Sequence, residues 1–338
     1  MANRNALVSK LLEHDDPSVR WKVLVRSVGE DPGSRKIARL QEEIRSSPRV
    51  KALLSRRGRD GRIKAKFGVY DKWQGAHWIM ATLADLGYPA GDESLRAMRD
   101  QVLELWLSKT FYDEFEAKGK AEAYRRDGVP VMQGRHRRCA SQQGNALFFL
   151  TQLGLADDAG ERLVERLLHW QWPDGGWNCD KDPSADTSSF METLTPMRGL
   201  AAYGTAKRNT KARAAARKAA DVFLSRRLHK RRSDGRVIHA EFVHLHYPLY
   251  WHYDVLGGLK AMAELGLVKD ERCSEALDLL ESKELEGGGW PAERRYYKLS
   301  DKVELGADYV DWGGTSKKTM NPWVTADALF VLREAGRL

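Results

Sequence analysis

Five apolar stretches of similar form recur along the 338-residue chain, and each ends in a glycine. Their apolar residues follow helical spacing, and a glycine after the last turn suits the left-handed conformation that often ends a helix. Recurrence at intervals of tens of residues is typical of repeat architectures. The pattern predicts equivalent inner helices within residues 70–87, 139–154, 188–204, 250–266 and 321–336.

A glycine-rich turn precedes each stretch, for example at residues 174–176 and 287–289. Asp-Gly and Gly-Gly pairs favour turns. Another helix-patterned stretch comes before each turn, so each unit contains an outer helix, a turn, a loop and an inner helix. No β-hairpin pattern competes with this interpretation. We therefore predict an all-α fold.

One of the turns carries a specific motif. Residues 171–177 read Gln-Trp-Pro-Asp-Gly-Gly-Trp, and residues 284–290 repeat this form with Glu in the place of Gln. The first stretch resembles the QW motif of the squalene and oxidosqualene cyclase family, whose α/α toroid is shared by protein prenyltransferase β subunits. The resemblance implies that residues 55–338 form an α/α toroid of about five helix pairs. A fold hosts many chemistries, so the resemblance says less about function.

Residues 1–54 precede the resemblance. Asp16 followed by Pro17 is typical of a helix start, with an acidic cap and a proline in the first turn. This start is similar to a HEAT-type repeat. We expect two or three helices here, forming a short N-terminal extension packed on the toroid.

The composition bounds the class of protein. With 42% hydrophobic and 30% charged residues, it is that of an ordinary globular chain. No apolar run approaches the ~20 residues that span a bilayer, and the first residues lack a secretory signal. Three cysteines are too few for a disulfide framework, so we expect a reduced, cytoplasmic protein. The net charge of +9 favours an anionic partner: nucleic acid, an anionic membrane surface or a phosphorylated small molecule.

The acidic motifs of terpene synthases are not matched in a useful position. No DxDD motif occurs in the sequence. A formal DDxxE match begins at Asp157, but it comes directly after Gly154. Acids are expected there because they stabilise the start of the next helix. Ordinary terpene cyclisation is therefore not indicated by either motif.

Candidate catalytic residues emerge when the stretches are aligned on their glycines. Gln142, Glu192 and Asp254 then share one level near the starts of three inner helices, with His252 close to Asp254. In a toroid these starts would surround one mouth of a central cavity. A partly desolvated carboxylate beside an imidazole is suited to acid–base catalysis. The alternative is a polar network of helix caps with no catalytic use.

The resemblance also raises zinc as a candidate cofactor. Protein prenyltransferases hold zinc with one Asp, one Cys and one His near inner-helix starts. The residues here that offer these ligand types are Cys179, Asp180, His246 and His252. Their spacing is not that of the family, and no CxxC or HExxH pattern supports it.

Aromatic and basic residues gather at the loops before the inner helices. Terpene cyclases line their pockets with aromatic rings that stabilise cations, and basic loops at helix starts favour phosphate or carboxylate. Cys139, at a helix start beside arginines, is either a reactive thiol or a packing residue. The predicted substrate-binding residues are Trp73, His77, Arg138, Cys139, Trp251, Tyr253 and Trp323.

These features predict an enzyme that acts on a small molecule with an apolar, isoprenoid-like body and an anionic group. A non-catalytic binding or scaffold protein built on the same toroid is the main alternative. Nucleic-acid binding is less favoured because no known nucleic-acid motif is present. A carbohydrate-active protein is a further alternative, because paired acids and aromatic rings also suit sugars. No feature predicts an oligomeric state.

Overall fold

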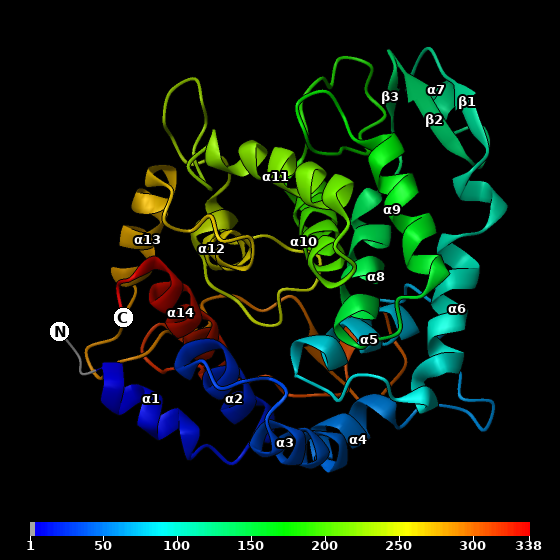
Figure 1. Ribbon diagram of the computed structural model, residues 1–338. Helices are drawn as coiled ribbons and strands as arrows, with labels where there is room; N and C mark the ends of the chain where they lie inside the picture. Colours follow the sequence, from blue (N-terminus) through cyan, green and yellow to red (C-terminus); the bar gives the residue numbers. More distant parts are fainter. Residues whose placement is uncertain (1–3) are drawn as a thin grey trace. The chain divides into compact units, whose positions relative to one another are not determined.

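The computed structural model describes residues 4–338, which are predominantly helical (Figure 1). The α-helices are α1 Arg4–Leu12, α2 Pro17–Lys22, α3 Arg35–Ser46, α4 Pro48–Leu54, α5 Ala76–Asp85, α6 Arg96–Trp106, α7 Lys120–Ala123, α8 Ala140–Gln152, α9 Asp158–Trp170, α10 Phe190–Ala206, α11 Thr210–Leu224, α12 Val255–Glu264, α13 Ser274–Glu281 and α14 Pro322–Ala335. A π-helical turn, Val23–Val28, continues α2. The strands are β1 Glu114–Glu116, β2 Val129–Met132, β3 Arg135–His136, β4 Lys298–Leu299 and β5 Ala307–Asp308.

The chain forms two compact units. Residues 1–91 together with 224–338 make unit 1, and residues 92–223 make unit 2. The predicted boundary at residue 54 stays a prediction. Among the described residues, no helix is both long and apolar enough to cross a membrane.

The predicted all-α class is confirmed, since helices α5, α8, α10, α12 and α14 occupy the five predicted stretches. Four of the terminal glycines have the expected positive φ, between 67° and 79°. They are Gly87, Gly154, Gly266 and Gly336.

The prediction for Gly204 is wrong. Helix α10 continues through it to Ala206, and Lys207 follows the last turn. A Cβ at position 204 would lie 2.6 Å from the Cγ of Arg213 in α11. Glycine is therefore needed here for the close approach of two helices, not to end one.

Unit 2 is centred on the packing of α8 against α10. A Cβ at Gly144 would lie 2.3 Å from the Cα of Pro196, and one at Gly199 would lie 2.4 Å from the carbonyl oxygen of Gly144. The two glycines therefore allow the helix backbones to touch. This contact fixes the starts of α8 and α10 side by side, where Cys139 and Glu192 lie.

Two tryptophans that follow glycine turns make equivalent hydrogen bonds. The Trp177 Nε1–H donates to the Leu167 carbonyl oxygen (3.0 Å), and its backbone N–H donates to Thr193 Oγ1 (3.1 Å). In unit 1, Trp290 donates in the same way to Leu280 (2.7 Å) and Thr325 (2.9 Å). Each buried indole thus joins an outer helix to the following inner helix.

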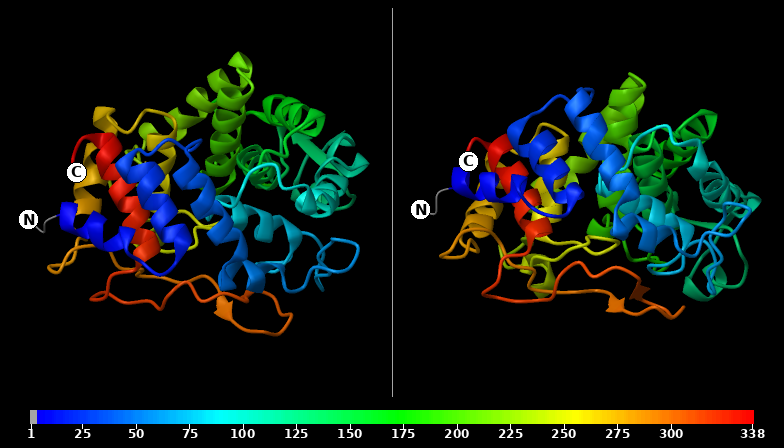
Figure 2. Two further views of the ribbon diagram at one scale, coloured as in Figure 1. Left: turned by 60° about the horizontal axis from the view of Figure 1, so that its bottom comes forward. Right: turned by 90° about the horizontal axis from the view of Figure 1, so that it is seen from below.

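In unit 1 the N-terminal helices pack against α14, as the blue and red ribbons show (Figure 2). Asp16 caps α2 as predicted, because its side chain accepts a hydrogen bond from the Ser18 N–H and Pro17 is the first helical residue. The segment to Leu54 contains four α-helices, more than the two or three expected.

A buried square of alternating charges joins four helices of unit 1. Lys22 Nζ lies 2.6 Å from an oxygen of Asp85 and 3.1 Å from one of Asp327. Lys260 Nζ lies 3.0 Å and 2.7 Å from the other oxygens of the same two carboxylates. Each charge therefore has two opposite neighbours, which offsets the cost of burying it. The Tyr247 hydroxyl also donates to Asp85 (2.7 Å).

The strands were not predicted, and they are short. β1 pairs in parallel with β2, and β2 pairs antiparallel with β3. β4 and β5 form a separate parallel pair. All five lie in the segments between helices, and β5 and β1 position Asp308 and Glu114.

Candidate functional site

Three loop segments of unit 1 bring together a group of aromatic rings, here called the aromatic platform: Trp73, Tyr250, Trp251, His252 and Tyr296. Trp73 stacks on Tyr250 with ring centroids 4.0 Å apart and planes 6° from parallel. His252 stacks on Tyr296 at 3.8 Å and 13°. The two pairs meet edge to face, since the Trp73 and His252 centroids are 5.7 Å apart. All members except Trp73 are partly exposed.

A cation lies over one side of the platform. The Lys72 ammonium is 4.7 Å from the centroid of Trp251 and 5.5 Å from that of Trp73. The contact shows that these rings stabilise a positive charge over their electron-rich faces.

Asp308 holds the first stacked pair in place through hydrogen bonds. The Tyr250 hydroxyl donates to Asp308 Oδ2, and the Trp312 Nε1–H donates to the same oxygen at 2.6 Å. Asp308 is 2% exposed, and burial raises the pKa of its carboxyl above the usual range, although these two hydrogen bonds act in the opposite direction. The Trp73 Nε1–H donates to the Tyr296 carbonyl oxygen (2.8 Å) and joins the two pairs.

His246 and Asp254 form a buried ion pair behind the second stacked pair. His246 Nδ1 lies 2.7 Å from Asp254 Oδ2, and the edge of the imidazole packs against the Tyr296 ring at 4.9 Å. Asp254 is also the N-cap of α12, because it accepts the Gly257 N–H at 2.7 Å. Burial lowers the pKa of His246, but the Asp254 carboxylate raises it by more, and the net pKa lies above its ordinary value.

His252 is the one imidazole of the platform. Burial lowers its pKa to about 3, with the charges of His246 and Lys72 acting in the same direction, so the ring is neutral at pH 7. Its buried Nδ1 has no hydrogen-bond partner among the described residues. The nitrogen of a neutral imidazole that carries no hydrogen can accept a hydrogen bond.

Other predicted binding residues of unit 1 lie in the interior. His77 is fully buried beside Tyr70 and Trp78, and burial lowers its pKa to about 3. The Tyr253 hydroxyl donates to the Leu228 carbonyl oxygen (2.6 Å), and Trp323 stacks on Tyr247 with centroids 5.2 Å apart. These contacts make all three side chains part of the packing of unit 1.

In unit 2, three side chains with metal-binding atoms meet at the starts of α8 and α10. Cys139, Cys179 and Glu192 place their Sγ and carboxylate atoms within 4.8 Å of one another. Glu192 is 3% exposed and accepts the Ser141 N–H at 3.1 Å. A hydrogen bond with Cys139, burial and the Glu192 charge together raise the pKa of the Cys179 thiol far above its usual range.

The remaining predicted residues of unit 2 lie around this cluster. Gln142 is partly exposed in the first turn of α8, and Arg138 lies over the Phe111 ring (4.6 Å) while donating to the Gly128 carbonyl oxygen. The Asp180 carboxylate accepts the Asp182 N–H at 2.9 Å. Of the predicted metal ligands, Cys179 and Asp180 belong to unit 2, whereas His246 and His252 belong to unit 1.

A second group of possible metal ligands lies on β1, β3 and α9 of unit 2. Glu114, His136 and His169 also place ligand atoms within 4.8 Å of one another. The Nε2 atoms of His136 and His169 lie 3.2 Å and 2.9 Å from the Glu114 carboxylate, which also accepts a hydrogen bond from Arg166 (3.1 Å). The group is more exposed than the thiol cluster and has a cation already paired with its carboxylate.

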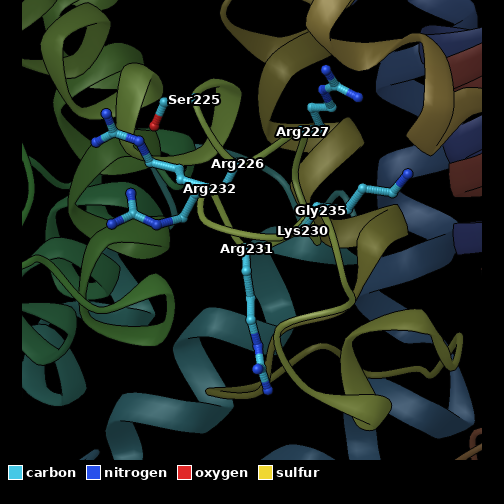
Figure 3. Close-up of a pocket in the computed structure, with 7 residues that line it drawn as sticks. All are labelled: Ser225, Arg226, Arg227, Lys230, Arg231, Arg232 and Gly235. Atoms are coloured by element: carbon cyan, nitrogen blue, oxygen red, sulfur yellow. The ribbon is translucent and has the colours of Figure 1, made fainter.

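A basic pocket with a volume of about 310 Å³ lies in unit 1 and is lined by the segment directly after α11. Its lining residues are Ser225, Arg226, Arg227, Lys230, Arg231, Arg232 and Gly235 (Figure 3). Arg227 and Lys230 both pair with Glu275. In Figure 3 the Arg231 side chain points away from those of Arg226 and Arg232, so the cations do not converge on one point. The pocket is a basic surface and a weaker candidate than the platform.

Several of these residues were not predicted from the sequence. Asp308 lies on the two-residue strand β5, within the long loop between α13 and α14, where the sequence has no helical pattern. Tyr296 lies in the same long loop, and no spacing relates it to His252. Three charged residues on apolar helix faces were also missed by the sequence analysis: Lys22, Lys260 and Asp327. An isolated charge at such a position indicates that the side chain is buried with a partner of opposite charge.

No protein-family model matches the sequence, and no curated protein matches it either. Solved structures show a weak likeness. A crystal structure of a protein from Actinoplanes has 18% identity and a TM-score of 0.43, covering 94% of this chain and 89% of that one. Two structures of the type II terpene cyclase MstE from Scytonema have TM-scores of 0.42 and 0.41 at 11% and 12% identity. They cover 96% of this chain and 87% and 88% of theirs, and hold merosterolic acid A and geranylgeranyl dihydroxybenzoate.

Proposed function

We propose that this protein is an enzyme that binds a small molecule with an apolar, isoprenoid-like body on the aromatic platform of unit 1. The observation that carries the proposal is the presence of two stacked ring pairs, Trp73 on Tyr250 and His252 on Tyr296, among half-buried residues. Aromatic faces bury apolar area and also stabilise a positive charge that develops in a bound molecule. The Lys72 ammonium over Trp251 is placed to meet an anionic group of the same molecule.

His252 is the proposed hydrogen-bonding group. Its neutral imidazole lies within the platform, and its Nδ1 is not satisfied by another described residue. Because a pKa of about 3 makes the ring a weak base, it would orient the bound molecule by accepting a hydrogen bond and would not take up a proton at neutral pH. The group is not suited to donate a proton at neutral pH, since its pKa is about 3.

Asp254 has a positioning role in this proposal. Its carboxylate is fully buried and is occupied by the α12 backbone and by His246. It therefore acts on the platform through His246, whose ring supports Tyr296. Such support holds the ring surface rigid before a ligand arrives, which reduces the cost of binding.

A non-catalytic binding protein is the second candidate. The engagement of Asp254 in a helix cap favours it, because a carboxylate that is fully occupied by its own fold is not available for acid–base chemistry. Ligand binding by the platform is common to both candidates, and turnover separates them.

Turnover with a panel of prenyl compounds tests the proposal. The purified chain is incubated with prenyl diphosphates, prenyl alcohols and prenyl carboxylates of different length, and products are identified by mass spectrometry. A product formed by the wild type and lost in His252→Ala supports an enzyme. Tight binding without any product supports the non-catalytic candidate. Neither binding nor product would reject the platform as a site for this class of molecule.

A further inference from the structure

We propose that Cys139, Cys179 and Glu192 of unit 2 bind a zinc ion. This site is independent of the aromatic platform, and the proposal stands whether or not the platform binds a prenyl compound. Three protein ligands would leave the fourth position of a tetrahedral zinc to water or to an atom of a small molecule.

The geometry of the three side chains is close to that of a zinc site. Ligands bound to tetrahedral zinc at about 2.1–2.3 Å are separated from one another by about 3.6–3.8 Å. The two Sγ atoms and the Glu192 carboxylate oxygen lie within 4.8 Å of one another. Movements of about 1 Å or less, within the reach of side-chain rotation, would therefore complete the site.

The types of ligand select the metal. Thiolates are soft ligands that favour zinc and other late transition metals, whereas magnesium and calcium need a shell of oxygen ligands. Two sulfurs and one carboxylate therefore indicate zinc. The group of Glu114, His136 and His169 has no sulfur, and its carboxylate is already paired with Arg166.

The loop that carries Cys179 is fixed in place without a metal. Buried Arg137, two residues before Cys139, donates through Nη1 to the carbonyl oxygens of Asp180 and Asp182, each at 2.9 Å. The Asn178 side chain donates to the Thr187 carbonyl oxygen (2.9 Å) and closes the loop. These bonds hold Cys179 beside Cys139 and limit the entropy that metal binding would cost.

Neither sulfur is used to cap a helix. Cys139 occupies the N-cap position of α8, but its side chain makes no capping hydrogen bond. The Glu192 carboxylate reaches the start of α8, where it accepts a hydrogen bond from the Ser141 N–H. Cys179 lies in the loop between α9 and α10.

The charges around the site suit a metal complex of net charge −1. Two thiolates and one carboxylate carry three negative charges, of which a divalent ion balances two. The Lys181 ammonium lies close enough to interact with both sulfurs, and it is held by a hydrogen bond to the Ala123 carbonyl oxygen (3.1 Å). It would supply the remaining positive charge.

Cobalt substitution tests the site in the full-length chain. The protein is purified with a phosphine reductant, freed of metal with a chelator and titrated with Co²⁺. We expect one equivalent to bind with a thiolate-to-cobalt charge-transfer band in the near ultraviolet and tetrahedral d–d bands in the visible. Zinc should displace the cobalt and abolish these bands. Absence of a charge-transfer band in the reduced wild type would overturn the proposal.

Variants locate the metal. Cys139→Ser and Cys179→Ser should each weaken zinc binding by more than ~100-fold, because loss of a residue that only hydrogen-bonds a metal ligand already costs ~10–100-fold. Glu192→Gln should also weaken zinc binding, but it should keep the charge-transfer band because both thiolates remain. The matched control is His169→Ala, which removes a ligand of the other group and should leave the titration unchanged. A metal retained in both Cys variants but lost in His169→Ala would refute the thiol site. A disulfide between Cys139 and Cys179 that persists under the reductant would also refute it.

Discussion

The imidazole of His252 lies flat against the phenol ring of Tyr296, with the ring centroids 3.8 Å apart. Behind Tyr296 lies His246, and behind His246 lies Asp254 at the start of α12. Contacts from Tyr296 to His246, from His246 to Asp254 and from Asp254 to the backbone thus connect the aromatic platform to α12. A carboxylate with no exposed surface can in this way affect ligand binding without touching the ligand.

Replacement of Asp254 by Asn should reduce stability and, because the ring surface loses its support, also weaken ligand binding. The substitution removes the charge that pairs with His246, and we expect a loss of about 1–3 kcal/mol in the free energy of unfolding. Urea denaturation measures the loss, and calorimetric titration with a prenyl diphosphate should give a Kd that is about twofold to tenfold weaker than that of the wild type. A normal stability combined with lost binding would place Asp254 in direct contact with the ligand instead.

The same variant has a defined dependence on pH. The pKa of His246 is raised in the folded state, so the native protein holds this proton more tightly than the unfolded chain. Its contribution is complete below the ordinary value of 6.5 and is lost as pH rises through the folded-state pKa. The stability difference between wild type and Asp254→Asn should therefore shrink as pH rises. A difference that is constant from about pH 5 to 9 would contradict the ion pair.

The buried square of charges predicts strong coupling between its members. Asp327→Asn or Lys260→Met alone leaves an uncompensated buried charge and should cost about 3–5 kcal/mol. The double variant removes one charge of each sign, so it should cost clearly less than the sum of the two. Denaturation of the four proteins completes the cycle. Additive losses would show that the four charges act independently.

Acid should weaken the buried square of charges. Burial raises the pKa of the Asp85 and Asp327 carboxyls, but the two ammonium groups lower it by more, and both lie below the ordinary value of 3.8. The native state then binds fewer protons than the unfolded chain, so this contribution is present above that value and is lost as pH falls through the folded-state pKa values. Below about pH 4, the stability of the Asp327→Asn and Lys260→Met double variant should therefore decline less steeply than that of the wild type.

Removal of the hydrogen bond from the Trp177 indole should lower the stability of the protein. Trp177→Phe removes the N–H that the Leu167 carbonyl accepts and should destabilise the chain by about 1–3 kcal/mol. Trp251→Phe serves as the control, because this ring is partly exposed and should change stability by less than about 0.5 kcal/mol. Equal effects of the two substitutions would mean that the Trp177 hydrogen bond contributes little.

The helices were predictable because they depend on local periodicity. Apolar spacing and terminal glycines were sufficient for α5, α8, α12 and α14, and failed only at the end of α10. The local sequence pattern placed a helix end at Gly204. Glycine is needed there because Arg213 of the neighbouring helix packs closely against it, and a local pattern carries no information about such a contact.

The sites were less predictable because they depend on loops. The alignment on glycines placed Glu192 and Asp254 at helix starts, where both lie, but it could not show that their carboxylates bind backbone N–H groups. The meeting of Cys139 with Cys179 depends on Arg137 holding the second loop against the first, and that of His252 with Tyr296 depends on a loop without repeat pattern. Contacts between residues far apart in the sequence have no local signal.

Calorimetric titration of the platform with a prenyl diphosphate tests the central claim most directly. The wild type should bind, and Trp251→Ala should weaken binding by about tenfold or more, because a partly exposed ring of the platform is lost. Tyr124→Ala, which removes a ring that is 64% exposed in unit 2, is the matched control and should bind like the wild type. Equal affinity of the wild type and Trp251→Ala, or no binding by the wild type, would contradict the assignment of the aromatic platform as the binding site.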